Sequence, residues 1–132
     1  MEEPFESYFD GETLSLVRRF EKMLQQDQHF FFDVDEFEEI IEYYFFKNEQ
    51  RKAFMTINQA LEQHPGATSI LLKMAQFHVN AKKDHEALRI LKEIEHNDSA
   101  DSDLHLAKGN LYSQLEKPEK AIEEYKKFSK SI

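Results

Sequence analysis

The sequence predicts an all-α protein, a solenoid of about seven antiparallel helices, and three observations lead to this fold class. Three alanines, Ala53, Ala87 and Ala121, stand 34 residues apart. Other positions repeat in phase with these alanines and keep a matching chemical type. No stretch alternates polar and apolar residues with a period of two, so no strand is predicted. A fixed period of this size is typical of repeat arrays, which bind partners on their surface.

The 34-residue period extends to four further columns of residues. Each column keeps an aromatic, small or apolar character through most of its members: Phe37, Leu71 and His105; Ile41, Ala75 and Gly109; Tyr44, His78 and Tyr112; Ala60, Ile94 and Phe128. One matching column could arise by chance, but several columns in phase indicate a structural repeat. The two histidines, His78 and His105, replace aromatic residues, so we expect them to be packed within the helices.

The first helix is predicted over about residues 12–26, where Leu16, Phe20 and Met23 form an apolar stripe. The period fails in this region, because Arg19 stands where an alanine is expected. We therefore interpret residues 1–33 as an acidic N-terminal segment with a degenerate half-repeat that caps the array.

The remaining helices form three predicted pairs. Their apolar residues recur with helical spacing over 35–47 and 50–63, 68–81 and 84–96, and 102–115 and 118–130. Pro118 suits the first turn of a helix, where its missing N–H is not needed. The segment His64–Ala67 contains proline and glycine and predicts a helix end, with Thr68 or Ser69 capping the next helix. The predicted repeats are 34–67, 68–101 and 102–132.

The last repeat resembles the tetratricopeptide repeat (TPR) family. Gly109, Tyr112, Ala121 and Tyr125 follow that family's order of small, aromatic, small and aromatic residues, and Pro65 stands where a repeat often closes. The tryptophan that often opens the first helix is absent. The resemblance covers about residues 34–132 and extends, more loosely, to longer bacterial proteins of the family. It implies a right-handed α–α superhelix.

The TPR resemblance also implies a binding surface, because the first helices of these repeats line a concave groove. Carried over to this sequence, the groove residues are Asp35, Glu38, Glu42, Phe45, Phe46, Leu72, Gln76, Leu106 and Asn110. Some family members grip a C-terminal carboxylate with lysine, arginine and asparagine side chains. Here Glu38 and Glu42 replace the lysine and the asparagine, and such acidic side chains repel an acidic tail.

The charge is concentrated near the N-terminus. Residues 1–42 contain thirteen acids and three bases, a net charge of −10 against −9 for the whole chain. An acidic surface repels phosphate backbones, so no nucleic acid partner is expected. A basic or neutral peptide is favoured instead. The alternative interpretation is that these acids form a solvated surface without a partner.

Composition disfavours several other classes of protein. The chain has no cysteine, residues 1–6 are acidic rather than a signal peptide, and no apolar run could cross a membrane. We therefore expect a cytoplasmic protein with no membrane segment. No two histidines have the spacing of a metal pair, and the three glycines are isolated. The sequence thus predicts neither an enzyme nor a metal or cofactor site.

Two features leave alternatives open. The aromatic runs Phe30–Phe32 and Tyr43–Phe46 could pack in the core or could anchor a peptide through Phe45 and Phe46. The sequence ends after the second helix of the third repeat, where Tyr125 and Phe128 would normally meet a further repeat. We expect either a truncated longer array or a homodimer formed there. The leading hypothesis is a module that binds a peptide or helix, and the alternative is a structural spacer or self-association segment.

Overall fold

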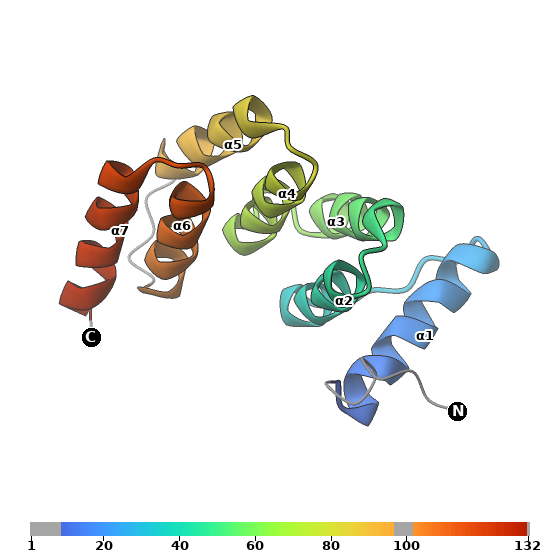
Figure 1. The fold of residues 1–132 in the computed structure, drawn as a ribbon. Coiled ribbons are helices and arrows are strands. Elements are labelled where there is room, and N and C mark those ends of the chain that lie inside the picture. The colour runs from blue at the N-terminus through green and yellow to red at the C-terminus, as the bar shows by residue number, and fades with distance from the viewer. Residues whose placement is uncertain (1–8, 97–101, 132) are drawn as a thin grey trace. The chain divides into compact units, whose positions relative to one another are not determined.

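The computed structural model describes residues 9–96 and 102–131, and every regular element in these ranges is an α-helix. The helices are α1 (Gly11–Gln25), α2 (Val34–Phe46), α3 (Gln50–Gln63), α4 (Thr68–Asn80), α5 (Asp84–His96), α6 (Ser102–Gln114) and α7 (Pro118–Ser131) (Figure 1). The predicted all-α class is confirmed, and each predicted helix is present with bounds that agree within one residue. None of these helices is long and apolar enough to span a membrane.

The chain divides after Ala67 into two compact units, residues 1–67 and 68–132. The division falls at the predicted boundary between the first and second repeats. Unit 1 contains α1 to α3 and unit 2 contains α4 to α7. Buried side chains form a core within each unit.

The core of unit 1 is aromatic. Phe20, Phe32 and Phe37 are fully buried, and their ring centroids lie 5.5 to 6.4 Å apart with steeply inclined planes. Tilted and edge-to-face arrangements suit the charge distribution of aromatic rings. In the aromatic run Phe30–Phe32, Phe32 therefore packs in the core, which is one of the two roles predicted for the aromatic runs. Its neighbour Phe31 remains 67% exposed.

Side chains at the end of α3 hold the extended segment that precedes α2. The Gln63 amide donates to the Phe30 carbonyl at 2.8 Å, and its oxygen accepts from the Phe32 amide at 3.0 Å. The His64 Nε2 atom lies 2.7 Å from the Phe32 carbonyl oxygen. These bonds satisfy backbone groups that no helix or strand could pair, because the segment belongs to neither.

The core of unit 2 is largely aliphatic. Its buried members come from α4 to α7 and from the turn after α6: Leu72, Ala75, Ala87, Ile90, Leu91, Ile94, Leu111, Tyr112, Leu115 and Ala121. Helices α6 and α7 approach closely at Gly109, where an added Cβ atom would lie 2.5 Å from a ring carbon of Tyr125. Glycine is therefore required at this position unless the Tyr125 ring moves.

The first helix of each pair ends in the same way. Asn48, Lys82 and Glu116 have positive φ angles of 57°, 63° and 59° and stand 34 residues apart. Each donates its amide to the carbonyl three residues back, and the next amide donates to the carbonyl five residues back. This is the Schellman arrangement, which satisfies helix-terminal carbonyls. The 34-residue period predicted from side chains is therefore also present in the backbone.

Candidate functional site

The acidic residues predicted for the groove lie at the surface of unit 1. Asp35 and Glu42 are exposed on α2, and Glu38 is half-buried. At the C-terminal end of the same helix Phe45 is half-buried and Phe46 is 49% exposed, with its ring edge-on to Phe9. Helix α2 thus presents carboxylates and an accessible aromatic ring, as a binding helix would.

Other carboxylates add to the negative charge around α2. Asp33 caps the helix and forms a reciprocal capping box with Glu36, which orders its first turn. Partial burial raises the pKa of Glu39, and the charges of Asp10 and Glu12 on the α1 side raise it further. The charges of Asp10 and Glu12 therefore oppose the ionisation of Glu39, in addition to the larger effect of burial.

The groove residues predicted in unit 2 lie in different environments. Gln76 is half-buried and donates to Asn80 and to Gln114, whereas Leu106 is exposed. Asn110 is exposed and accepts a 2.8 Å hydrogen bond from the Tyr125 hydroxyl.

Leu72 is buried within the core of unit 2, so it contributes packing rather than accessible surface. The predicted groove combines residues of both units, and it stays a prediction.

The residues predicted for self-association lie on α7. Tyr125 is half-buried against Gly109, and Phe128 is also half-buried. Ile122 on the same helix is 51% exposed, which the sequence analysis did not single out. Tyr125 is therefore used within unit 2, and Ile122 is the more accessible apolar side chain of α7.

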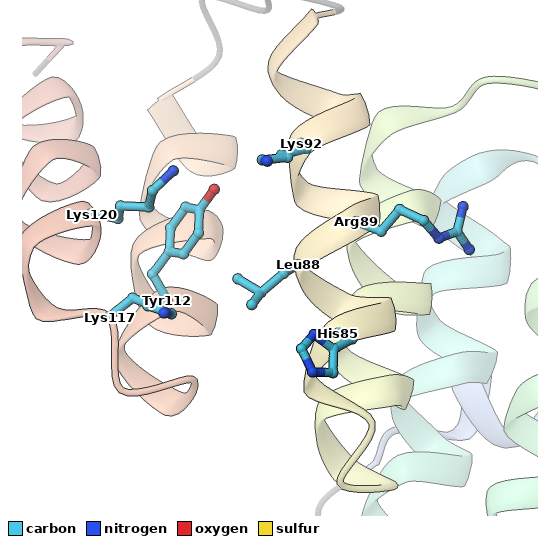
Figure 2. A pocket seen from close by; sticks show the side chains of 7 residues that line it. All are labelled: His85, Leu88, Arg89, Lys92, Tyr112, Lys117 and Lys120. Carbon is cyan, nitrogen blue, oxygen red and sulfur yellow. The ribbon is translucent and has the colours of Figure 1, made fainter.

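Unit 2 also contains a pocket of about 510 Å³ that the sequence analysis missed. Seven residues from α5, from α6, from the turn after α6 and from the first turn of α7 line it: His85, Leu88, Arg89, Lys92, Tyr112, Lys117 and Lys120. Figure 2 shows Leu88 and Lys92 projecting from α5 toward Tyr112, whereas the guanidinium of Arg89 points away. We call this the basic pocket, because four of its seven residues are lysine or arginine.

The cations of the basic pocket differ in how they are engaged. Arg89 forms ion pairs with Glu86 at 2.9 Å and Glu93 at 3.3 Å. Lys120 places its ammonium 5.5 Å from the centre of the Tyr112 ring, a cation–π distance. Within the described ranges, Lys92 and Lys117 form no ion pair with another residue. These two ammonium groups are therefore available to an incoming anion.

Tyr112 forms a wall of the basic pocket and is held in place by its hydroxyl. The hydroxyl donates a 2.6 Å hydrogen bond to Glu95 on α5. Burial raises the pKa of Tyr112, and the bond to Glu95 raises it further, so the phenol stays protonated. The neutral, buried Tyr112 ring therefore forms a fixed wall of the pocket beside the lysine side chains.

A second unexpected feature is a buried ion cluster between α6 and α7. Glu124 is 3% exposed, and its carboxylate lies 2.9 Å from Lys108 Nζ and 3.3 Å from His105 Nδ1. Lys127 is more distant, at 3.8 Å. Burial opposes ionisation of Glu124, but the hydrogen bond and charge of Lys108 outweigh it, and the pKa lies below its usual value.

Sequence reasoning expected His105 to be packed, and it is buried. It missed the cluster because Lys108 and Glu124 resemble ordinary surface charges in a helical pattern. The signal that could have found them is the repeat itself, since both stand in columns that are otherwise mostly apolar. No group of three or more His, Asp or Glu side chains that could hold a metal ion occurs among residues 9–96 and 102–131.

Comparison with known proteins found no matching family model, no matching curated protein and no matching solved structure.

Proposed function

We propose that this chain is a protein–protein interaction module of stacked helix pairs, related to TPR units. The observation that carries the proposal is the recurrence of one helix-terminal turn at Asn48, Lys82 and Glu116, 34 residues apart. Arrays of repeated helix pairs offer extended surfaces to partners. The TPR resemblance of the sequence, which implies a concave binding groove in a right-handed superhelix, supports the same function.

The partner proposed for unit 1 is a basic or neutral peptide or helix that contacts α2. Asp35, Glu38 and Glu42 supply the negative charge, and complementary charge raises association rates and disfavours acidic competitors. Phe46, which is half-exposed, supplies an aromatic side chain of the kind enriched at binding hot spots.

An affinity capture followed by mass spectrometry, with two variants of equal net charge, tests this proposal. Glu42→Lys reverses a carboxylate on α2, whereas Glu62→Lys reverses an exposed carboxylate on α3. We expect a partner that binds wild type and the Glu62→Lys control but is lost with Glu42→Lys. A partner retained equally by both variants would contradict binding at α2.

A second variant, Phe46→Ser, tests the aromatic contribution. Because this side chain is half-exposed, we expect the far-ultraviolet circular dichroism spectrum to stay unchanged while partner binding weakens. Loss of helical signal would instead assign Phe46 to the packing of unit 1.

Self-association through α7 is the alternative function, and the exposure of Ile122 favours it. Multi-angle light scattering over a range of concentrations tests whether the chain self-associates. A dimer that dissociates with Ile122→Lys would support self-association, and a monomer at all concentrations would exclude it.

A further inference from the structure

We infer that the basic pocket of unit 2 binds an acidic peptide segment, in which aspartate or glutamate carboxylates stand next to an aliphatic or aromatic side chain. This inference is independent of the function proposed for unit 1, because it concerns the other unit and a ligand of opposite charge. Leu88 and the Tyr112 ring lie among lysines in the lining of this pocket.

The first step is the charge of the pocket. Lys92 on α5, Lys117 in the turn before α7 and Lys120 on α7 converge on one hollow. Three ammonium groups in one hollow repel one another, and an anion relieves this repulsion. Arg89 is excluded from this set, because it pairs with Glu86 and Glu93 and points away.

Among residues 68–96 and 102–131, no ion pair joins these three lysines to an acid. Glu95 accepts the hydrogen bond of Tyr112, and Glu124 pairs with Lys108. Both belong, with Glu123, to a separate hollow of about 200 Å³ that shares only Tyr112 and Lys120 with the basic pocket.

The second step distinguishes a peptide from other anions. Leu88, which is half-buried, offers apolar surface that a free phosphate cannot use but a leucine or phenylalanine side chain can, and the buried Tyr112 ring backs this part of the pocket. A nucleic acid is disfavoured, because the whole chain has a net charge of −9 and would repel a long phosphate backbone. A short acidic segment meets only the local positive charge.

The third step is the contrast within the chain. Residues 1–67 contain fifteen acids and six bases, whereas residues 68–132 contain eleven of each. Unit 2 therefore tolerates the approach of an acidic segment, which unit 1 would repel. The basic pocket lies in this neutral unit.

The experiment is a titration of the full isotope-labelled chain, followed by amide chemical shifts, with a short peptide of alternating glutamate and leucine. Both peptide ends are blocked, so that no terminal carboxylate contributes. We expect saturable shifts at Leu88, Lys92, Tyr112, Lys117 and Lys120, and none for a peptide with glutamine in place of glutamate. Equal binding of the glutamine peptide would overturn the inference.

Two pairs of lysine substitutions provide matched variants. Lys92→Glu with Lys117→Glu reverses two pocket charges, whereas Lys126→Glu with Lys130→Glu makes the same net change at exposed sites of α7 outside the pocket lining. All four lysines are exposed, so both variants should fold. We expect the pocket variant to bind roughly tenfold or more weakly, since two ion pairs are lost, and the control to stay within about threefold. An equal loss in both would show attraction by net charge alone and would overturn the inference.

Inorganic phosphate and Leu88→Ser separate a peptide site from a simple anion site. We expect phosphate at the peptide's concentrations to leave the peptide bound, and Leu88→Ser to weaken binding of the glutamate–leucine peptide while leaving a glutamate–glycine peptide unchanged. If phosphate alone produced the same shifts and displaced the peptide, the pocket would be an inorganic anion site and the peptide assignment would be wrong.

Discussion

Phe37 and His105 stand two repeat periods apart, in the same column of helices α2 and α6, yet they make different contacts. Phe37 is fully buried among the rings of Phe20 and Phe32 in unit 1. His105 is buried in unit 2 and faces the carboxylate of Glu124 at 3.3 Å. The side chain in this column is therefore buried in both units, whereas its chemical type differs between them.

The charged residues that cluster with His105 also differ in chemical type from the residues of their columns in the other repeats. Lys108 and Glu124 occupy columns in which the first repeat has Ile40 and Thr56 and the second has Met74 and Ile90. Because the other repeats fold with mostly apolar residues at these positions, the backbone does not require the ion cluster. Burying charges costs free energy that only good pairing recovers. The comparison leads to five predictions about the two units.

The largest effect is expected from Phe37→Ala in the aromatic core. Removing the ring leaves a cavity among Phe20 and Phe32, and we expect the free energy of unfolding to fall by about 3–5 kcal/mol. Chemical denaturation measures the loss, and hydrogen exchange should place it in α1 to α3. His105→Leu, which introduces the residue of the second repeat at the same column, should cost less. An equal loss for both variants would contradict the contrast.

The next effect is expected from Glu124→Gln in the ion cluster. This change leaves Lys108 charged, buried and without its counter-ion, and we expect a loss of about 3 kcal/mol in the free energy of unfolding. The double variant Lys108→Met with Glu124→Ile introduces the residues of the second repeat. We expect this double variant to unfold with nearly wild-type stability, because no charge is left unpaired. A double variant as unstable as Glu124→Gln would show that the cluster is required.

Acid pH provides an independent measurement of the same cluster. The pKa of Glu124 is lower in the folded state than its usual value of 4.5, so the carboxylate stabilises the fold at pH values above 4.5. This contribution is lost as the pH falls through the folded pKa, because the protonated group no longer pairs with Lys108. The Glu124→Gln variant should lack this part of the acid dependence in a thermal denaturation series.

A smaller effect is expected from removing tyrosine hydroxyls. Tyr44 donates to Glu21 at 2.8 Å in unit 1, and Tyr112 donates to Glu95 at 2.6 Å in unit 2, so each joins a helix to the one before it. We expect Tyr44→Phe and Tyr112→Phe each to cost about 1 kcal/mol. The loss should be smaller at Tyr44, because its acceptor Glu21 keeps an ion pair with Lys52. Urea denaturation of the two variants checks the order.

The smallest effect is a gain in stability at the left-handed turns. Glycine adopts positive φ angles without a steric penalty, whereas lysine and glutamate do so at a cost. We expect Lys82→Gly and Glu116→Gly to raise the free energy of unfolding by about 0.5 kcal/mol. Asn48→Gly should change it less, because asparagine tolerates this conformation. Thermal unfolding that ranks Asn48→Gly first would contradict this explanation.

Several features could be predicted from the sequence because they depend on local chemistry. Apolar residues at helical spacing predicted all seven helices found in residues 9–96 and 102–131, and Pro118 and His64–Ala67 predicted where helices begin or end. The exposed carboxylates of α2 could also be predicted, since helix faces follow from residue spacing.

Other features could not be predicted in this way, because they depend on which helices approach one another. Leu72 was predicted to be accessible, but the packing of α5 and α6 around it makes it part of the core. The lysines of the basic pocket come from positions far apart in the sequence, and nothing local relates Lys92 to Lys117.

The sequence by itself determined the helices, their 34-residue period and the acidic charge of α2, because each follows from spacing and composition along the chain. The tertiary structure decided which of the regular positions became chemically distinct. Packing of α6 on α7 placed Glu124 between Lys108 and His105 in a buried setting. Packing of α5 near α6 and α7 opened a pocket beside Tyr112. Burial and proximity depend on neighbours that are distant in sequence, so the repeat pattern alone could not reveal them.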